Sequence, residues 1–196
     1  MSSNILKRAI DIATEVHEGQ TRKGTDIPYI THPIEVQETV RRHGGSEIEQ
    51  AAALCHDTVE DGGGLATLER LRRELGEEVA AIVAACSDSF ATDATQKAPW
   101  QQRKDAYIAH LRDEASTSAL LVSCADKLAN AQATLRDLTD PAVGAAVWER
   151  FSTGEAGQHW YYGCLVEVFA TRLPGPLSAE FAQTIADLRA LSTRAN

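Results

Sequence analysis

Apolar residues recur at intervals of three and four positions along most of the chain, which is the spacing of amphipathic α-helices. The first such segment places five residues on one helical face: Leu6, Ala9, Ile10, Ala13 and His17. Segments that alternate between apolar and polar residues, the pattern of a half-buried strand, are absent from the sequence. The pattern therefore predicts an all-α fold.

Prolines, glycines and capping residues divide this pattern into about nine or ten helices. Pro33 suits the first position of a helix that Gly44 and Gly45 end. Ser46 and Glu49 have the spacing of a capping box, so a further helix is expected to begin there and to run into His56 and Asp57.

The later helices are bounded by weaker signals. Thr67 is the expected N-cap of a helix that stops at Gly76. Further helices are expected over residues 77–88, 99–114, 118–138, 141–151, 155–173 and 176–192. The longest loop is expected over residues 89–98.

The length of 196 residues suits one domain over residues 1–196, with core motifs in 5–138 and C-terminal helices in 141–192. Hydrophobic residues make up 43% of the chain, enough for a sizeable core. No stretch approaches the roughly 20 apolar residues that a membrane helix needs, and the N-terminal segment lacks the apolar region of a signal peptide. We therefore expect a cytoplasmic protein with no membrane partner.

The formal net charge of −9 argues against nucleic acid as a general partner. A small anionic ligand remains possible where a metal or a local group of cations reverses the field. The 4 cysteines stand singly in apolar patterns and form no CxxC pair, so buried thiols are favoured over disulfides.

The stretch AALCHDTVED, which ends at Asp61, concentrates ionisable side chains directly after an apolar run. It contains His56, Asp57, Glu60 and Asp61, a poor composition for a hydrophobic core. An isolated His-Asp pair has an ordinary structural explanation, in which a buried histidine stands beside an aspartate that caps a helix. The placement of two other residues, His32 and Asp126, favours a metal site instead.

His32 directly precedes Pro33, so it is expected at a helix entrance, where a side chain can reach into a cleft. Asp126 stands within the apolar run LLVSCADKLANA, and a buried carboxylate needs a cation or strong hydrogen-bond donors. Lys127 is adjacent and is expected to point elsewhere, whereas Asn130, at i+4, shares the face of Asp126.

His32, His56, Asp57 and Asp126 together supply two imidazoles and two carboxylates. This set suits a divalent first-row metal that keeps coordination positions for water. Affinity alone favours zinc or nickel over manganese, so the sequence does not select the ion.

The ordered motifs HEGQTRK, PYITHP, AALCHDTVED and ADKLAN resemble the hydrolase domain of RelA/SpoT-type alarmone enzymes. The chain most resembles the stand-alone small alarmone hydrolases of the HD phosphohydrolase superfamily. The resemblance covers about residues 6–138, with weaker similarity through residues 160–162. It implies an all-α HD-domain helical bundle around one metal ion, and hydrolysis of the 3′-pyrophosphate of (p)ppGpp to pyrophosphate and GDP or GTP.

The resemblance also implies roles for individual residues. It assigns Mn²⁺ to His32, His56, Asp57 and Asp126, and it places Glu60 and Asp61 as the catalytic acidic pair beside the metal-bound water. Spacing alone leaves that pair equally compatible with a solvated loop start before Gly62.

Several cations are candidates for contact with the anionic nucleotide substrate. Arg22 and Lys23 lie in a polar loop between two helices; a solvated basic turn is the ordinary alternative, and the resemblance favours a nucleotide contact. The resemblance places Lys127 and Asn130 at the nucleotide and Tyr29 near it, although Tyr29 is nearly as compatible with packing. Lys104, with Lys97 and Arg103, is a weaker candidate for gripping the distal phosphates.

The sequence departs from the family pattern at Ala129, where relatives carry a larger ring-bearing residue, and at Asp88, whose role stays open. The substrate alternatives are (p)ppApp and the 2′-phosphate of NADPH. A nucleotide-binding regulator without turnover and a plain helical interaction domain are the non-enzymatic alternatives. A homodimer is possible if the aromatic residues Trp148, Trp160, Tyr161 and Tyr162 form an interface, but they equally suit the core.

Overall fold

The computed structural model describes residues 3–91, 95 and 97–195. In these residues the fold is all-α, which confirms the expected class. The helices are α1 (Ser3–Val16), α2 (Thr31–Arg42), α3 (Glu47–Cys55), α4 (Thr58–Asp61), α5 (Leu65–Leu75), α6 (Glu77–Cys86), α7 (Trp100–Asp113), α8 (Thr117–Thr139), the 3₁₀-helix η2 (Gly144–Arg150), α9 (Gly154–Arg172) and α10 (Pro176–Ala195).

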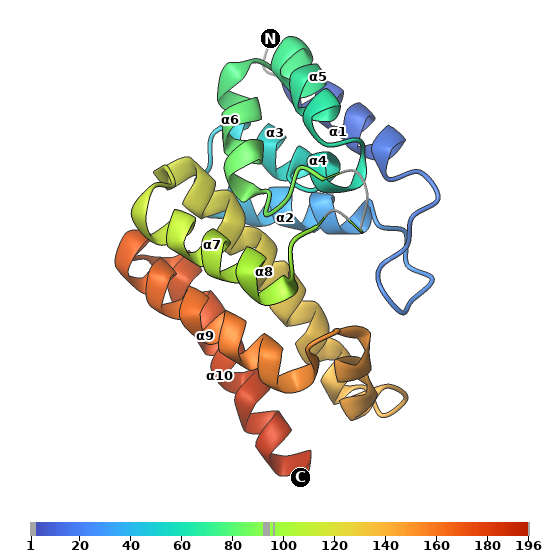
Figure 1. Cartoon of the computed structure of the whole chain (residues 1–196), viewed down its shortest axis with the longest axis vertical. Helices are drawn as coiled ribbons and strands as arrows, with labels where there is room; N and C mark the ends of the chain where they lie inside the picture. The colour runs from blue at the N-terminus through green and yellow to red at the C-terminus, as the bar shows by residue number, and fades with distance from the viewer. Residues whose placement is uncertain (1–2, 92–94, 96, 196) are drawn as a thin grey trace.

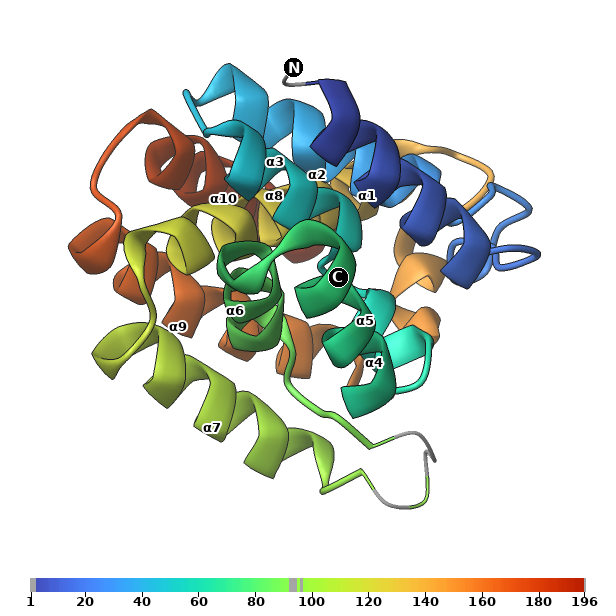
Figure 2. The same ribbon diagram turned by 90° about the horizontal axis from the view of Figure 1, so that it is seen from above.

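Helix α8 is the central element of the fold. It contacts α2, α3 and α6 of the N-terminal half and α9, α10 and η2 of the C-terminal half. Figure 1 shows it joining these two halves along the long axis of the molecule, with the chain termini at opposite ends. In the view from above, α7 runs along the outer edge beside α9 (Figure 2).

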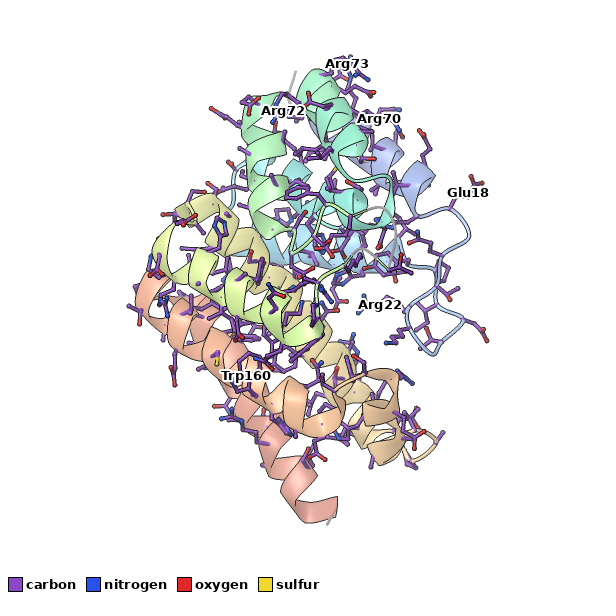
Figure 3. The ribbon with its side chains drawn as sticks, viewed as in Figure 1. Glu18, Arg22, Arg70, Arg72, Arg73 and Trp160 are labelled. Atoms are coloured by element: carbon purple, nitrogen blue, oxygen red, sulfur yellow. The ribbon has the colours of Figure 1, made fainter. Side chains whose placement is uncertain are left out.

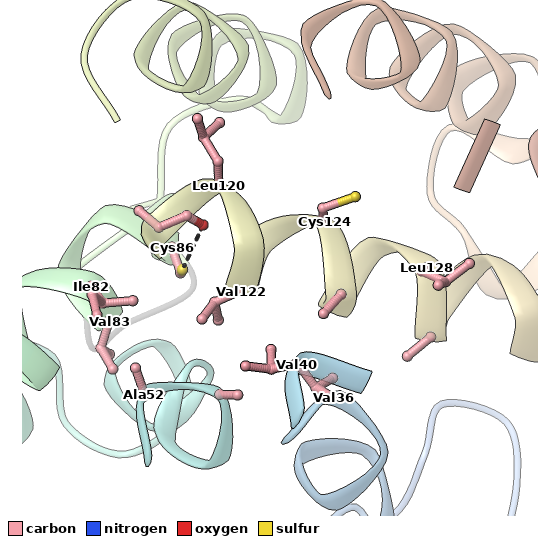
Figure 4. Packing of buried hydrophobic residues seen from close by; sticks show 14 of the residues in the cluster. Val36, Val40, Ala52, Ile82, Val83, Cys86, Leu120, Val122, Cys124 and Leu128 are labelled. Atoms are coloured by element: carbon pink, nitrogen blue, oxygen red, sulfur yellow. Dashed lines mark hydrogen bonds between the residues drawn. The ribbon is translucent and has the colours of Figure 1, made fainter. Parts of the chain in front are cut away.

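The hydrophobic core is one continuous cluster of buried side chains drawn from α1 to α10. Around α8 it includes Val36 and Val40 of α2, Ala52 of α3 and Val83 of α6, on the side of the helix that carries Val122 (Figure 4). Apolar residues thus surround much of the helix that carries Asp126. None of the helices in the described residues combines the length and the apolarity needed to cross a membrane.

The capping box predicted for the third helix is present. The Ser46 hydroxyl accepts the backbone N–H of Glu49, and the Glu49 carboxylate accepts the N–H of Ser46 at 2.7 Å. Helix α3 ends at Cys55, so His56 occupies its C-terminal boundary, and the short helix α4 follows separately.

Three boundary predictions were wrong. Helix α2 begins at Thr31, two residues before Pro33. Its first turn tolerates the proline because the N–H that a proline lacks has no helical partner there. Helix α5 begins at Leu65 and not after Thr67, whose hydroxyl instead donates to the Gly62 carbonyl. The segment expected to be helical over 141–151 forms the 3₁₀-helix η2. The loop predicted over 89–98 lies partly outside the described residues.

Gly62 allows α4 to lie close against α1. A Cβ atom at this position would lie 2.5 Å from Val16 Cγ1 and 2.6 Å from the Thr58 carbonyl oxygen. The next residue of the triple glycine, Gly63, has a φ of 111°, which side-chain-bearing residues rarely adopt. The triple glycine therefore sets the position of α4, the helix that carries Glu60.

We expect Gly62→Ala to lower the free energy of unfolding by about 1–3 kcal/mol, because the added methyl overpacks against a backbone oxygen that cannot rotate away. Urea unfolding measures the change. Gly175→Ala is the matched control, since its Cβ has no atom within 4 Å and its φ is not positive. Equal losses in the two variants would contradict the packing role assigned to Gly62.

Candidate metal centre

Three side chains from two segments meet at the start of α2 and the end of α3. His32, His56 and Asp57 each offer a ligand atom, and these atoms all lie within 4.8 Å of one another. The Nε2 atoms of the two histidines are 3.2 Å apart, and Asp57 Oδ2 lies 2.9 Å from His56 Nε2. Because both imidazoles are buried, this group lies at the inner end of the site.

Helix α8 adds the fourth candidate ligand. Asp126 Oδ1 lies 3.0 Å from His32 Nε2 and 3.5 Å from His56 Nε2. The four residues expected to bind a metal are therefore brought together from three parts of the chain.

The chemistry of this group fits a divalent cation. His56 Nδ1 lies 2.8 Å from the Ala53 carbonyl oxygen and donates to it, so Nε2 is the nitrogen turned toward the other ligands. Two imidazole nitrogens and two carboxylates in a buried position are a suitable donor set for a first-row metal. The same set does not distinguish manganese from its neighbours.

Electrostatics favour positive charge at the centre. Burial alone would lower the pKa of His56, but Asp57 and Asp126 outweigh burial and raise this pKa well above its ordinary value. Burial opposes ionisation of Asp126 as well, yet Lys127 and His56 hold the pKa of this carboxyl well below the usual range. The carboxylates thus stay ionised and attract a cation.

Lys127 does not point away from the centre as expected. Its Nζ lies 2.5 Å from Asp126 Oδ2, because the long side chain folds back onto the neighbouring carboxylate. Asn130 does share the face of Asp126, and its Nδ2 donates to Asp126 Oδ1 at 2.6 Å. Asn130 Oδ1 in turn accepts from Arg22 at 2.8 Å, which connects the loop before α2 to the centre. Figure 3 labels Arg22 on this loop.

Tyr29 contacts a candidate ligand directly. Its hydroxyl donates to Asp57 Oδ2 at 2.6 Å, and its ring lies 4.7 Å, centroid to centroid, from the buried ring of His17. Burial and the charge of Asp57 raise the pKa of Tyr29, so the phenol keeps its proton as the donor. The hydrogen bond orients Asp57, an arrangement typical of groups that support metal ligands.

The acidic pair of α4 borders the same centre. Glu60 Oε1 accepts the backbone N–H of Asp88 at 2.9 Å. Burial, together with the negative charges of Asp88 and Asp57, raises the pKa of Glu60 to about 7. Burial and Asp57 also raise the pKa of Asp61. Glu60 is therefore suited to exchange a proton near neutral pH.

Two neighbouring hollows adjoin the candidate ligands. A chamber of about 140 Å³ is lined by Asp57, Glu60, Asp88, Asp126 and others, and a separate cleft has a volume of about 540 Å³. Four residues line both hollows: Tyr29, Lys104, Lys127 and Asn130. Arg22, Lys23, His32 and Asp61 line the cleft, so every predicted site residue except the buried His56 borders one hollow or the other.

Sequence reasoning missed several residues that line the cleft. Arg136 and Asp137 lie on α8. Asp137 continues the helical face of Asp126 and Asn130, which is a signal that the helical period contained, whereas Arg136 lies to one side of this face. Arg150 of η2 pairs with Asp137 and packs on Gly24, where a Cβ would lie 2.7 Å from its Nε. No sequence pattern indicated Arg150, because the contact joins segments far apart in the chain.

The structure places two further sets of residues that the sequence analysis singled out. Ala129 is 1% exposed and lines neither hollow, so its small side chain belongs to the core. Among the C-terminal aromatic residues, Trp148, Tyr161 and Tyr162 are buried and close the core, whereas Trp160 is 37% exposed. The homodimer stays a prediction.

Comparison with known proteins identifies related sequences and structures. A sequence model of the family described as HD domain matches residues 9–150. A probable GTP pyrophosphokinase of Mycobacterium leprae is 44% identical over 80 residues, which are 41% of this chain and 10% of the relative. A guanosine-3′,5′-bis(diphosphate) 3′-pyrophosphohydrolase of Haemophilus influenzae is 34% identical over 121 residues, 61% of this chain and 17% of the relative. The matches thus span only a small part of these curated relatives.

Two solved structures have a similar fold over most of their length. One, described as a metazoan ortholog of SpoT that hydrolyzes ppGpp and plays a role in starvation responses, aligns with a TM-score of 0.73 and 25% identity, covering 95% of this chain and 96% of that one. The other, from Listeria monocytogenes EGD-e, aligns with a TM-score of 0.66 and 28% identity, covering 83% of this chain and 98% of that one.

We expect the protein to bind one Mn²⁺ per chain, and we expect His56→Ala and Asp126→Asn each to weaken binding at least 100-fold, beyond the 10–100-fold typical of outer-shell partners. Isothermal titration calorimetry and elemental analysis measure this. His110→Ala is the matched control, because His110 lies on α7, lines neither hollow and pairs with Glu114 four residues along the chain. Undiminished binding in His56→Ala would contradict the assigned centre.

Proposed function

The chain belongs to the HD domain family, and from this premise we propose that it is a metal-dependent hydrolase of alarmone nucleotides. The proposed reaction removes the 3′-pyrophosphate of (p)ppGpp and releases pyrophosphate with GDP or GTP. The observation that carries the proposal is the convergence of His32, His56, Asp57 and Asp126 beside a chamber that also contains Glu60 and two lysines. Relatives named as hydrolases of this nucleotide support the substrate.

In this proposal the four converging side chains hold one divalent ion, which we take to be Mn²⁺ from the family resemblance. When bound, such an ion supplies Lewis-acid stabilisation for phosphoryl oxygens and acidifies the attacking water. Tyr29 fixes the orientation of Asp57 through its hydroxyl. Asn130 does the same for Asp126.

The acidic pair accepts the proton of the attacking water and later releases it. Glu60 lines the chamber, and its pKa of about 7 lets the carboxylate accept a proton and release it at neutral pH. Asp61 lines the adjoining cleft and adds negative charge that favours proton uptake nearby. Because hydrolysis of a phosphoryl group needs little covalent chemistry from the protein, positioning of water and phosphate provides most of the rate enhancement.

Cations on the boundary between the two hollows hold the substrate. Lys104 and Lys127 line both the chamber and the cleft, so they are placed to contact the 3′-phosphates while the nucleoside occupies the cleft. Arg22 and Lys23 line the cleft, where a guanidinium binds phosphate through two hydrogen bonds or stacks on a base. The chamber also contains several carboxylates, which repel an anion. It therefore accepts the substrate phosphates only when the metal ion and the two lysines together outweigh these negative charges.

We expect Glu60→Gln to lower kcat for ppGpp by 10²–10⁴-fold, the usual contribution of a general base, while Mn²⁺ binding is retained. Product chromatography with ppGpp, ppApp and NADPH measures turnover before and after chelation of the metal. Glu78→Gln is the matched control, because Glu78 is an exposed residue of α6.

Two results would overturn the proposed function. Turnover of NADPH or ppApp without turnover of ppGpp would assign a different substrate. If none of the three nucleotides is hydrolysed and ppGpp still raises the melting temperature, the protein is a nucleotide-binding regulator instead.

A further inference from the structure

Asp88, the second residue after α6, contacts the acidic pair through Glu60. Its side chain is 5% exposed, although it belongs to no helix. Its backbone N–H donates to Glu60 Oε1 at 2.9 Å. Its two carboxylate oxygens accept from Arg103 at 2.5 Å and from Lys104 at 2.6 Å.

These contacts join four elements around Glu60. Arg103 and Lys104 belong to the first turns of α7, and Arg103 Nε also donates to the Ala98 carbonyl oxygen at 3.1 Å. Lys104 Nζ lies 4.9 Å from the ring centroid of Tyr161 on α9, a cation–π distance. Asp88 therefore connects α4 with the start of α7 and, through Lys104, with α9.

We propose that Asp88 is a positioning residue, which fixes Glu60 through its backbone N–H and is itself fixed by the paired cations of α7. The inference rests on the proposed function, in which Glu60 accepts the proton of the attacking water and Lys104 contacts the phosphates. Asp88 does not touch the reacting atoms in this scheme. It couples the orientation of the general base to the cations that grip the substrate.

The geometry explains why this residue is a carboxylate. Arg103 and Lys104 are buried to similar degrees, with side chains 19% and 17% exposed, so each needs a nearby acceptor. A single carboxylate with two oxygens satisfies both, and this double attachment restricts the backbone of the loop at the N–H that Glu60 accepts. An amide in its place keeps the size of the side chain but loses the charge.

The charge of Asp88 also acts on Glu60 through space. Four charged groups face Glu60: Asp57 at the start of α4, Asp88 after α6, Lys104 on α7 and Lys127 on α8. After burial, the charge of Asp88 is the larger of the two repulsions that raise the pKa of Glu60, and that of Asp57 is the smaller. Removing the charge of Asp88 lowers the pKa of Glu60. It also leaves the positive charges of Lys104 and Arg103 without their partner, and these charges lower the pKa of Glu60 further.

The test compares Asp88→Asn with the wild-type enzyme loaded with Mn²⁺ and supplied with ppGpp. We expect kcat to fall at least tenfold while KM is unchanged or lower, because the freed cations bind phosphate at least as well. We also expect the acid limb of the kcat–pH profile to move to lower pH. A purely structural ion pair would lower the melting temperature without this split between kcat and KM.

Two further variants complete the experiment. Asp105→Asn is the matched control, since it removes the same charge from an exposed position next to Lys104 on α7. Arg103→Gln removes one partner of Asp88 and leaves the Asp88–Lys104 pair, so we expect it to lower kcat less than Asp88→Asn does. This variant tests the proposal even if Asp88→Asn does not fold.

The possible outcomes separate the inference from the proposed function. Normal kcat in both Asp88→Asn and Arg103→Gln, with wild-type turnover intact, would overturn the role of Asp88 alone. A rise in KM with unchanged kcat would do the same, because it would make Asp88 a substrate-binding residue. If the wild-type protein turns over none of the nucleotides, the proposed function fails and the positioning role fails with it.

Discussion

The carboxylate of Asp126 is the constraint on which the rest of the site depends. It is 4% exposed and lies in the middle of α8, the helix that contacts both halves of the fold. An ionised carboxylate in such a position costs several kcal/mol unless positive charge and hydrogen-bond donors surround it. The surrounding structure supplies His32 from α2, His56 from the end of α3, and Lys127 and Asn130 from α8 itself. Helix packing and the electrostatics of the centre are thus two aspects of one arrangement.

This arrangement explains how an acidic protein would accept the anionic substrate that we propose. The chain carries a net charge of −9, and the chamber beside Asp126 adds the carboxylates of Asp57, Glu60 and Asp88. A phosphate group enters such a chamber only if local cations outweigh these charges. Lys104 and Lys127 supply part of that charge, and in the proposed site a divalent ion held by the two histidines and two carboxylates would supply the remainder. The pairing of each lysine with a carboxylate keeps both cations in place before substrate arrives.

Much of the architecture and the convergence of the site followed from the sequence. Helical periodicity identified the all-α class, and the burial cost of Asp126 together with His32 and the His56–Asp57 pair indicated one shared centre. The failures have physical reasons. The position of Lys127 depends on the conformation of a long side chain, and the link from Asp88 to Arg103 and Lys104 depends on tertiary contacts around α7. Local patterns also could not distinguish the 3₁₀-helix η2 from an α-helix, because both share a similar residue spacing over one or two turns.

Anomalous X-ray diffraction from crystals of the protein grown with Mn²⁺ tests the proposed metal centre most directly, because it locates the bound ion. The account predicts one strong anomalous peak within coordination distance of four atoms: His32 Nε2, His56 Nε2 and one carboxylate oxygen each from Asp57 and Asp126. A peak at another position would contradict the central claim. So would a well-ordered His56 whose Nε2 donates to Asp126 with no ion between them at saturating Mn²⁺.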